Sequence, residues 1–147
     1  MLPQQLRLPS QLTRLNKTNM PDQAANVIIN DNGRILLLLR SAGWKTGYWG
    51  PPGGIADEGE STKDTAIRET FEETGLTIKE EDLHFLMAKT KRDFGAVWFY
   101  TTDKFSGDIK LSWEHKKYIW LELEDLDDYD VTFEPNEIEM IKGSLLS

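Results

Sequence analysis

Short apolar runs along this chain are separated by turn signals, a pattern typical of strands joined by tight turns. Residues 25–29 predict a first strand, and the sequence Asn-Asp-Asn-Gly at 30–33 predicts a tight turn. The run RILLLLR at 34–40 predicts a second strand. Because its consecutive leucines leave no polar face, we expect this strand to be buried on both sides.

Further apolar runs follow in the second half of the chain. They predict strands at 83–89, 96–102, 109–111 and 118–121. The acidic stretch 123–130 is irregular, with one helical turn near Leu126. The last segment, 134–146, predicts an amphipathic helix. Its apolar members are Ile138, Met140, Ile141 and Leu145. This order of strands and helices predicts a mixed sheet covered by helices.

A helix with an unusual charge pattern is predicted between Ser61 and Gly75. Ser61 is a favoured N-cap residue, and Gly75 stands where a helix needs a residue that tolerates left-handed angles. The side that we expect to pack inward consists of Ala66, Ile67, Thr70, Phe71 and Thr74. Three acids on the other side lie within an arc of about 100° around the helix axis. They are Glu69, Glu72 and Glu73.

This acidic face does not stabilise the helix, because like charges three and four positions apart repel. Hard divalent cations prefer oxygen ligands, and Mg²⁺ is usually held by one or two carboxylates together with water and phosphate. The face therefore indicates either a metal site or a solvated acidic surface. The pattern around it favours the metal site.

The residues around this helix resemble the signature of the Nudix hydrolases. Gly54 is followed after five residues by Glu60, and after seven more by the run RETFEETGL at 68–76. Every fixed glycine, glutamate and arginine of the signature is present at its spacing. Thr70 is the one departure, since it stands where the family prefers an aliphatic residue. The resemblance implies an α/β/α sandwich with a mixed sheet, formed by residues 21–147.

The resemblance also implies a reaction and the residues that perform it. Nudix hydrolases cleave a nucleoside diphosphate linked to a second group, by attack of water on phosphorus. Position by position, Glu69, Glu72 and Glu73 resemble metal ligands, with the carbonyl of Gly54 as a further oxygen. The implied cofactor is Mg²⁺, with Mn²⁺ as an alternative. Glu69 is also expected to activate the water, and Arg68 to hold one carboxylate through an ion pair four positions away, with either Glu72 or Asp64.

Two acids outside the helix face complete the candidate site. Glu60 is expected to be structural, by accepting backbone N–H groups or by pairing with a base. Glu114 lies in the run Ser-Trp-Glu-His at 112–115, which resembles an element of several Nudix enzymes in which the glutamate binds metal or acts as a base. The alternative is a solvated loop acid, with His115 as a surface histidine beside two lysines.

Substrate contacts are expected mainly from the loop at 41–50. Its aromatic residues Trp44, Tyr48 and Trp49 either stack on a base or cover the core. Arg40 and Lys91, which flank predicted strands, are also assigned to the substrate, with Lys91 as a partner for phosphate charge.

Sequence signatures of particular Nudix substrates are mostly absent. No proline lies between Pro52 and Pro135, where ADP-ribose members carry one after the signature. The run Arg-Asp-Phe at 92–94 stands where diadenosine polyphosphate members tend to carry a tyrosine. The motifs of the NADH and coenzyme A members are also missing. A (deoxy)nucleoside triphosphate pyrophosphohydrolase and a nucleotide-sugar hydrolase remain, and the Glu-His element favours the triphosphates.

A non-catalytic function is the alternative from another class. Some Nudix domains are ligand-sensing modules, and these typically lack the carboxylates of the helix. All of these carboxylates are present here, which favours an enzyme. A simple calcium-binding domain is disfavoured because the spacing of a calcium loop is absent.

Composition narrows the partners and the location. With 147 residues and no cysteine, the chain is expected to form one domain without disulfides, and we expect it to be cytoplasmic. No apolar run approaches the length of a membrane span. The net charge of −8 arises entirely in residues 120–147, which hold nine acids and one lysine. No basic stripe is visible, so the expected partner is a small-molecule nucleotide and not a nucleic acid or a membrane.

Residues 1–20 form a predicted N-terminal extension. They contain three basic residues and no acid, and two prolines interrupt any long helix. An acid-free start with arginines also occurs in transit peptides, but the continuous apolar core of a secretory signal is absent. We expect the extension to pack on the domain or on a partner subunit, and the second arrangement would make the protein a homodimer.

Overall fold

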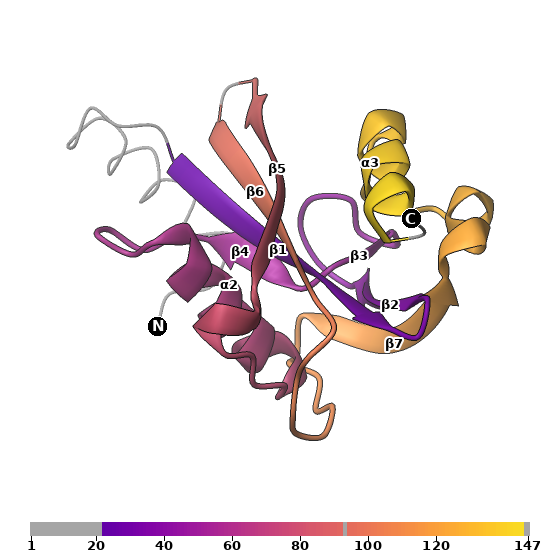
Figure 1. The fold of residues 1–147 in the computed structure, drawn as a ribbon, viewed down its shortest axis with the longest axis horizontal. Helices are drawn as coiled ribbons and strands as arrows, with labels where there is room; N and C mark the ends of the chain where they lie inside the picture. Colours follow the sequence, from indigo (N-terminus) through magenta and orange to yellow (C-terminus); the bar gives the residue numbers. More distant parts are fainter. Residues whose placement is uncertain (1–21, 93, 146–147) are drawn as a thin grey trace.

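A computed structural model describes residues 22–92 and 94–145 (Figure 1). The predicted extension at 1–20 lies outside these residues. The elements in chain order are β1 (Asp22–Asp31), β2 (Arg34–Arg40), β3 (Trp49–Gly50), β4 (Gly53–Ile55), α2 (Thr62–Thr74), the 3-10 helix η1 (Glu80–Asp82), β5 (His84–Lys91), β6 (Gly95–Thr102), β7 (His115–Glu122), the 3-10 helix η2 (Leu123–Asp128) and α3 (Pro135–Leu145). No helix in the described part is long and apolar enough to cross a membrane.

The strands form one mixed sheet, as predicted. Its main path has the order β3-β2-β1-β6-β5, while β4 pairs with β1 and β7 pairs with β2. β1 and β6 run parallel, and the other pairs are antiparallel. β1 and β2 pair only beside their turn, at Asn30 and Asp31. The sheet therefore opens into two parts, β5-β6-β1-β4 and β3-β2-β7.

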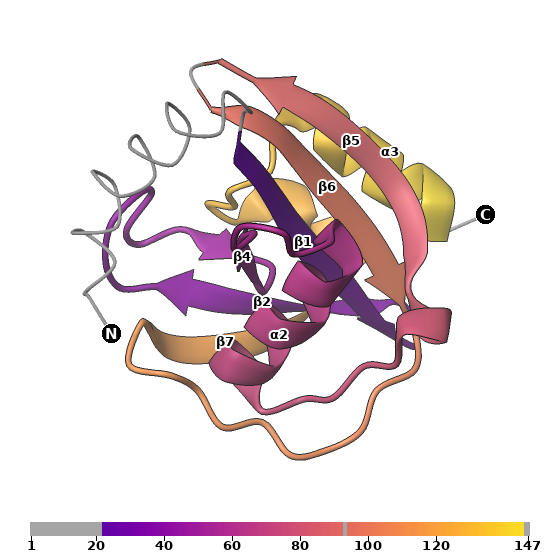
Figure 2. The ribbon, with the colours of Figure 1, turned by 90° about the vertical axis from the view of Figure 1, so that its left-hand side faces the viewer.

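The helices α2 and α3 cover opposite faces of the sheet (Figure 2). The core on the α3 side includes Ile28, Ile35, Leu37, Phe99 and Ile141. The core on the α2 side includes Val27, Ile29, Leu36, Leu38 and Ala66. Successive residues of β2 enter opposite cores, and residues 35–38 are fully buried, so the expectation of a strand covered on both faces is confirmed. The α/β/α sandwich is confirmed as well.

One predicted strand, at 109–111, is wrong. In its place the backbone N–H groups of Lys110 and Ser112 donate to the carbonyls of Thr74 and Glu73, at 2.7 and 3.3 Å. The last carbonyls of a helix have no partner within the helix, and this segment supplies partners for α2. The other strands and both helices lie where the sequence predicts them, with ends shifted by a few residues.

The inward face of α2 also differs from the prediction, because Phe71 is 57% exposed. The buried residues of the helix are Thr65, Ala66, Glu69, Thr70, Glu73 and Thr74. A helix turns by about 100° per residue, so a face centred on Ala66, Thr70 and Glu73 leaves Phe71 outside. As a consequence, two of the three glutamates turn inward.

Candidate active site

The helix α2 is fixed by caps at both ends. Oγ of Ser61 accepts a hydrogen bond of 3.0 Å from the N–H of Asp64, which confirms the predicted N-cap. Gly75 has a φ of +78°, and its N–H donates to the carbonyl of Phe71 at 2.8 Å. A Cβ built on Gly75 would also lie 2.9 Å from the carbonyl oxygen of Asp108. Glycine is therefore required at this end.

The strand β4 passes directly beside two of the glutamates. Oε1 of Glu73 accepts a hydrogen bond of 3.0 Å from the N–H of Gly53. A Cβ built on Gly54 would lie 2.6 Å from Oε2 of Glu69, so a residue other than glycine would collide with this carboxylate. Glu69 and Glu73 are 5% and 7% exposed. This acidic pair is packed against β4 and is not part of a solvated surface.

Arg68 holds the acids near the start of α2. Its guanidinium donates to both oxygens of Glu60, at 2.8 and 2.9 Å, and also binds Glu69 at 2.8 Å and Glu72 at 3.2 Å. The hydrogen bonds from Arg68 lower the pKa of Glu60 to about 2. Glu60 accepts the N–H of Asp57 at 3.0 Å as well. The expected ion pair with Glu72 and both kinds of contact expected for Glu60 are confirmed.

Negative charge accumulates around Glu73. Burial, followed by the charge of Glu69 and that of Glu114, raises the pKa of Glu73 well above its usual range. The N–H of Gly53 and the charge of Arg40 oppose this increase only in part. A cation between the carboxylates would remove the repulsion, and carboxylate oxygens are ligands that Mg²⁺ prefers. The acidic pair therefore fits a divalent cation.

No group of three acidic or imidazole side chains in residues 22–92 and 94–145 forms a ready-made metal site. Glu72, the third expected ligand, has a side chain that is 55% exposed and turns to Arg68. Glu69 binds the same guanidinium. Because Glu60 holds Arg68 through two hydrogen bonds, the arginine can release Glu72 and keep its place. The contact with Glu72 is therefore not needed to keep the guanidinium in place.

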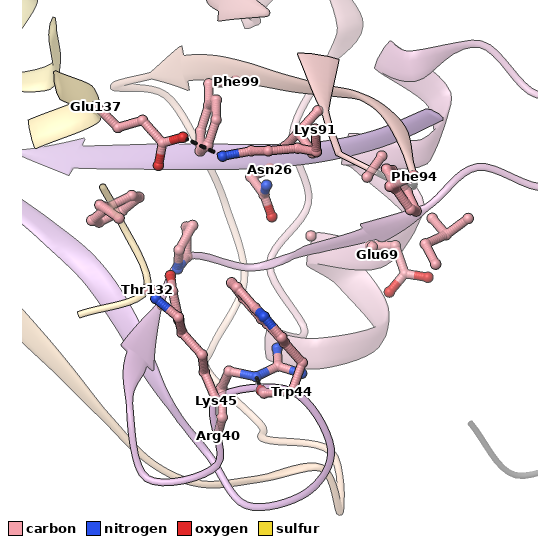
Figure 3. A pocket seen from close by; sticks show the side chains of 18 of the residues that line it. Asn26, Arg40, Trp44, Lys45, Glu69, Lys91, Phe94, Phe99, Thr132 and Glu137 are labelled. Carbon is pink, nitrogen blue, oxygen red and sulfur yellow. Dashed lines mark hydrogen bonds and ion pairs between the residues drawn. The ribbon is translucent and has the colours of Figure 1, made fainter. Parts of the chain in front are cut away.

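A cavity of about 720 Å³ opens beside the acidic pair. Glu69 lies on one side of it, while Arg40 reaches it from the end of β2, and Trp44 and Lys45 reach it from the segment after β2 (Figure 3). Small-molecule sites have volumes of roughly 300–1,000 Å³. The cavity is large enough for a nucleotide.

The loop before β7 brings Glu114 to the same cavity, and the first residue of β7, His115, lines it as well. His115 is 8% exposed, so the alternative of a surface histidine is wrong. Burial and the nearby charge of Arg40 lower its pKa to about 4, and its imidazole is therefore neutral at pH 7. Glu114 shares the cavity with the helix carboxylates, while its role stays a prediction.

The aromatic residues of the loop at 41–50 have different surroundings. Trp44 lines the cavity and is 64% exposed, whereas Tyr48 and Trp49 are not among the lining residues. Trp49 packs on the core below α3, as the core-covering alternative predicts. Arg40 and Lys45 lie 5.6 and 5.2 Å from the centre of the Trp44 ring. Lys45 was not predicted to lie at the cavity; the available signal was its position in the sequence next to a tryptophan.

Lys91 lines the cavity but is bound within the protein. Its Nζ donates to Glu134 and Glu137, each at 2.7 Å, and Figure 3 shows the second of these contacts at the cavity. Lys89 adds a hydrogen bond of 2.6 Å to Glu134. Glu137 is 2% exposed. The charge of Lys91 is therefore matched by α3, which the sequence did not predict.

Comparisons with known proteins agree with this geometry. The model of the family described as NUDIX domain matches residues 20–142. The bis(5'-nucleosyl)-tetraphosphatase (asymmetrical) of Mus musculus is 39% identical over 103 residues, which cover 65% of this chain and 69% of that protein. A MutT NUDIX hydrolase from Burkholderia pseudomallei has a TM-score of 0.72 at 25% identity, over 84% of this chain and 97% of that chain. An Ap4A hydrolase of C. elegans has a TM-score of 0.62 at 28% identity, over 84% and 96%.

The family match covers most of the chain and includes the helix, the glycines and the arginine that build the acidic site. Nudix hydrolases cleave pyrophosphate bonds of nucleoside diphosphate-linked substrates and generally use divalent metal ions. The chain belongs to the NUDIX family and is a hydrolase of nucleoside diphosphate-linked substrates.

Proposed function

We propose that this enzyme cleaves dinucleoside polyphosphates asymmetrically. The supporting observation is the make-up of the cavity wall, where Glu69 and Glu73 share one space with Arg40, Lys45 and Arg92. Each phosphate of the substrate carries negative charge. A polyphosphate in this cavity has a metal-binding carboxylate pair on one side and basic side chains elsewhere on the wall, so it finds attractive partners along its length.

Two aromatic side chains on separate segments favour a substrate with two bases. Trp44 follows β2, and Phe94 lies in the turn between β5 and β6; both line the cavity (Figure 3). The face of an aromatic ring can stack on any base. A substrate with a nucleoside at each end therefore has a stacking surface for each base.

The relatives named above support the same substrate class. The sequence disfavours dinucleoside polyphosphates as substrates, because the run at 92–94 holds no tyrosine. A protein named for that class is nevertheless 39% identical to this chain. The absence of a tyrosine is therefore too weak a reason to exclude these substrates.

The acidic residues are assigned to the cofactor. Glu69 and Glu73, with the carbonyl of Gly54, would hold a divalent cation, and Glu72 would join them when Arg68 releases it. When bound, this cation, which we expect to be Mg²⁺ with Mn²⁺ as an alternative, offsets phosphate charge and lowers the pKa of bound water.

Proton transfer is assigned to Glu114. A carboxylate bound to a cation is a weak base, because the cation lowers its pKa. Glu114 lines the cavity on a different segment from the helix carboxylates, where it can accept the proton that the attacking water loses. Arg68 keeps Glu69 in place throughout and has no proton to exchange at neutral pH.

The (deoxy)nucleoside triphosphates expected from the sequence are the second candidate. The observation that favours them is that Glu114 and His115, the element linked to triphosphates, do line the cavity. Nucleotide sugars have less support, since they lack the additional phosphate charge that Arg40, Lys45 and Arg92 would bind.

Anion-exchange chromatography of the hydrolysis products formed from a panel of nucleotides tests the proposal. The panel contains a dinucleoside tetraphosphate, a deoxynucleoside triphosphate and a nucleotide sugar, each with and without Mg²⁺. We expect kcat/KM to be at least about tenfold higher for the tetraphosphate, with a nucleoside triphosphate and a monophosphate as products. A preference for the deoxynucleoside triphosphate would contradict the proposal in favour of the second candidate.

A further inference from the structure

The end of β2 is tied to the loop that carries Glu114. The hydroxyl of Ser41 donates a hydrogen bond of 2.6 Å to the carbonyl oxygen of Glu114, and the N–H of Ser41 donates to the same oxygen at 3.1 Å. The two residues are 73 positions apart in the sequence. This contact therefore connects two distant segments of the cavity wall.

Strand register brings the two residues together. β2 and β7 pair antiparallel, and a register shift after Leu38 places Arg40 opposite His115. One position further along, Ser41 stands opposite Glu114. Ser41 thus directly follows β2 and contacts the loop that carries Glu114.

The other side of the Glu114 loop is held by α2. The N–H of Ser112 donates to the carbonyl of Glu73, and the N–H of Lys110 donates to that of Thr74. Glu73 is itself a member of the acidic pair. The backbone around Glu114 is therefore held between the helix that carries the proposed metal ligands and the end of β2.

Because two donors of Ser41 share one acceptor, removal of one donor can change the position of Glu114 without unfolding the protein. Without its hydroxyl, Ser41 would still donate its N–H to the Glu114 carbonyl, so this oxygen would not lose its last partner. The carbonyl of Glu114 would nevertheless lose one of its two donors. Small displacements of a catalytic group cost large factors in rate, because reacting atoms need close alignment.

We propose that Ser41 is a positioning residue of the hydrolytic reaction, whose hydroxyl fixes Glu114 against the acidic pair. The proposal rests on the role of Glu114 in the proposed function. Ser41 also begins the segment that contains Trp44 and Lys45. The same hydrogen bond therefore couples the segment that contacts substrate to the residue that takes the proton.

The test compares Ser41→Ala with Ser41→Thr, which retains a hydroxyl, and with Ser106→Ala, which changes an exposed serine outside this contact. Each is made in the wild type and in Glu114→Gln, and each is assayed on whichever nucleotide of the panel is hydrolysed fastest. We expect Ser41→Ala to lower kcat about tenfold, the equivalent of one hydrogen bond, with KM unchanged. The threonine variant should recover most of the rate, and the Ser106 control should match the wild type.

Two further measurements separate positioning from folding. In the Glu114→Gln background Ser41→Ala should cause no additional loss, since the two residues then act as one unit. The unfolding midpoint of Ser41→Ala should fall by no more than about 4 °C. Its affinity for a non-hydrolysable nucleotide analogue with Mg²⁺, measured by calorimetry, should equal that of the wild type.

Three results would overturn the proposal: wild-type kcat in Ser41→Ala, an equal loss in both backgrounds, or a loss that appears in KM alone. These outcomes are distinct from failure of the proposed function. Wild-type turnover of Glu114→Gln would remove the role of Glu114 and this proposal with it. An impaired Glu114→Gln together with normal Ser41 variants would remove only the role of Ser41.

Discussion

Two single residues, Gly54 and Thr70, affect the acidic helix in different ways: the first makes room for the site, and the second affects stability. Gly54 leaves the space that the carboxylate of Glu69 occupies, so its lack of a side chain belongs to the site. Thr70 brings a hydroxyl into a fully buried position, where its oxygen has no hydrogen-bond partner among the described residues. The family signature fixes the first position, and Thr70 departs from it at the second. The departure is expected to lower stability without touching the chemistry.

Replacing Thr70 by valine should therefore stabilise the protein. Valine keeps the shape of the side chain and removes an unpaired buried hydroxyl, which should raise the free energy of unfolding by about 1 kcal/mol. Thr74→Val is a matched control, because the Thr74 hydroxyl donates to the carbonyl of Thr70 at 2.6 Å and accepts the N–H of Leu76 at 3.1 Å. Urea denaturation should give opposite signs for the two variants, and equal effects would contradict the explanation.

Glu73→Gln and Glu72→Gln should lower turnover by orders of magnitude and leave the fold intact. The glutamine at 73 can still accept the N–H of Gly53, and it removes a buried charge that Glu69 repels. The experiment measures kcat at saturating Mg²⁺, Mn²⁺ affinity by calorimetry and the unfolding midpoint, with Glu124→Gln as an exposed-acid control. Near-normal turnover in both helix variants would remove the metal assignment.

Glu60 should make the free energy of unfolding depend on pH in the acidic range. Its pKa is about 2 in the folded protein against a usual value of 4.5, so between these values the unfolded chain binds a proton that the folded chain does not. The contribution of Glu60 is therefore complete above pH 4.5 and is lost as the pH falls toward 2. Glu60→Gln should be less stable than the wild type at neutral pH and should lose less stability between pH 5 and pH 3. Parallel curves of unfolding midpoint against pH would show that Glu60 plays no such part.

At the scale of elements, local periodicity was sufficient for the longer strands and for both α-helices, because alternation and helical spacing are properties of neighbouring residues. It did not predict β3, which lies in the predicted loop at 41–50, or β4, because two and three residues are too few to show a periodic pattern. It failed where the decisive partner is distant in sequence. The segment at 109–111 has the sequence pattern of a strand, but its Lys110 N–H donates to a carbonyl at the end of α2. The family signature identified the acidic pair and Arg68. Lys91 and Glu137 are 46 positions apart, and no local sequence pattern predicts that they pair.

This pairing gives a prediction about how α3 is held on β5. Lys91→Met should lower the free energy of unfolding by about 1–3 kcal/mol. Glu137 is 2% exposed, and of its two lysine partners it would keep only Lys89, at 3.2 Å, besides the backbone N–H of Glu134. KM should change little, since the charge of Lys91 is matched before substrate binds. Denaturation and steady-state kinetics are compared with Lys116→Met, an exposed control. A large rise in KM at unchanged stability would instead support the role in substrate binding that the sequence suggested.

At the scale of the whole molecule, negative charge is concentrated in one part of the sequence. Residues 120–147 alone carry the net charge of −8, and only Glu134 and Glu137 of their acids line the cavity, where both bind Lys91, whereas Arg40, Lys45 and Arg92 add basic side chains to the cavity wall. A small nucleotide can enter the cavity and meet the basic side chains. A long polyanion would extend beyond the cavity and meet the acidic surface, so the charge distribution selects for short substrates.

A comparison of a free cap dinucleotide with the same cap on an RNA of about 20 nucleotides tests this selection. Tight binding of nucleic acid needs many basic contacts that release counterions, and residues 120–147 offer acids instead. We expect the capped RNA to be cleaved more slowly than the free dinucleotide, and added salt to reduce this difference by screening the repulsion. Fluorescence anisotropy with uncapped RNA should show no binding at physiological salt. Tight binding that weakens steeply with salt would contradict the prediction, because it would reveal a basic surface that replaces counterions along the RNA.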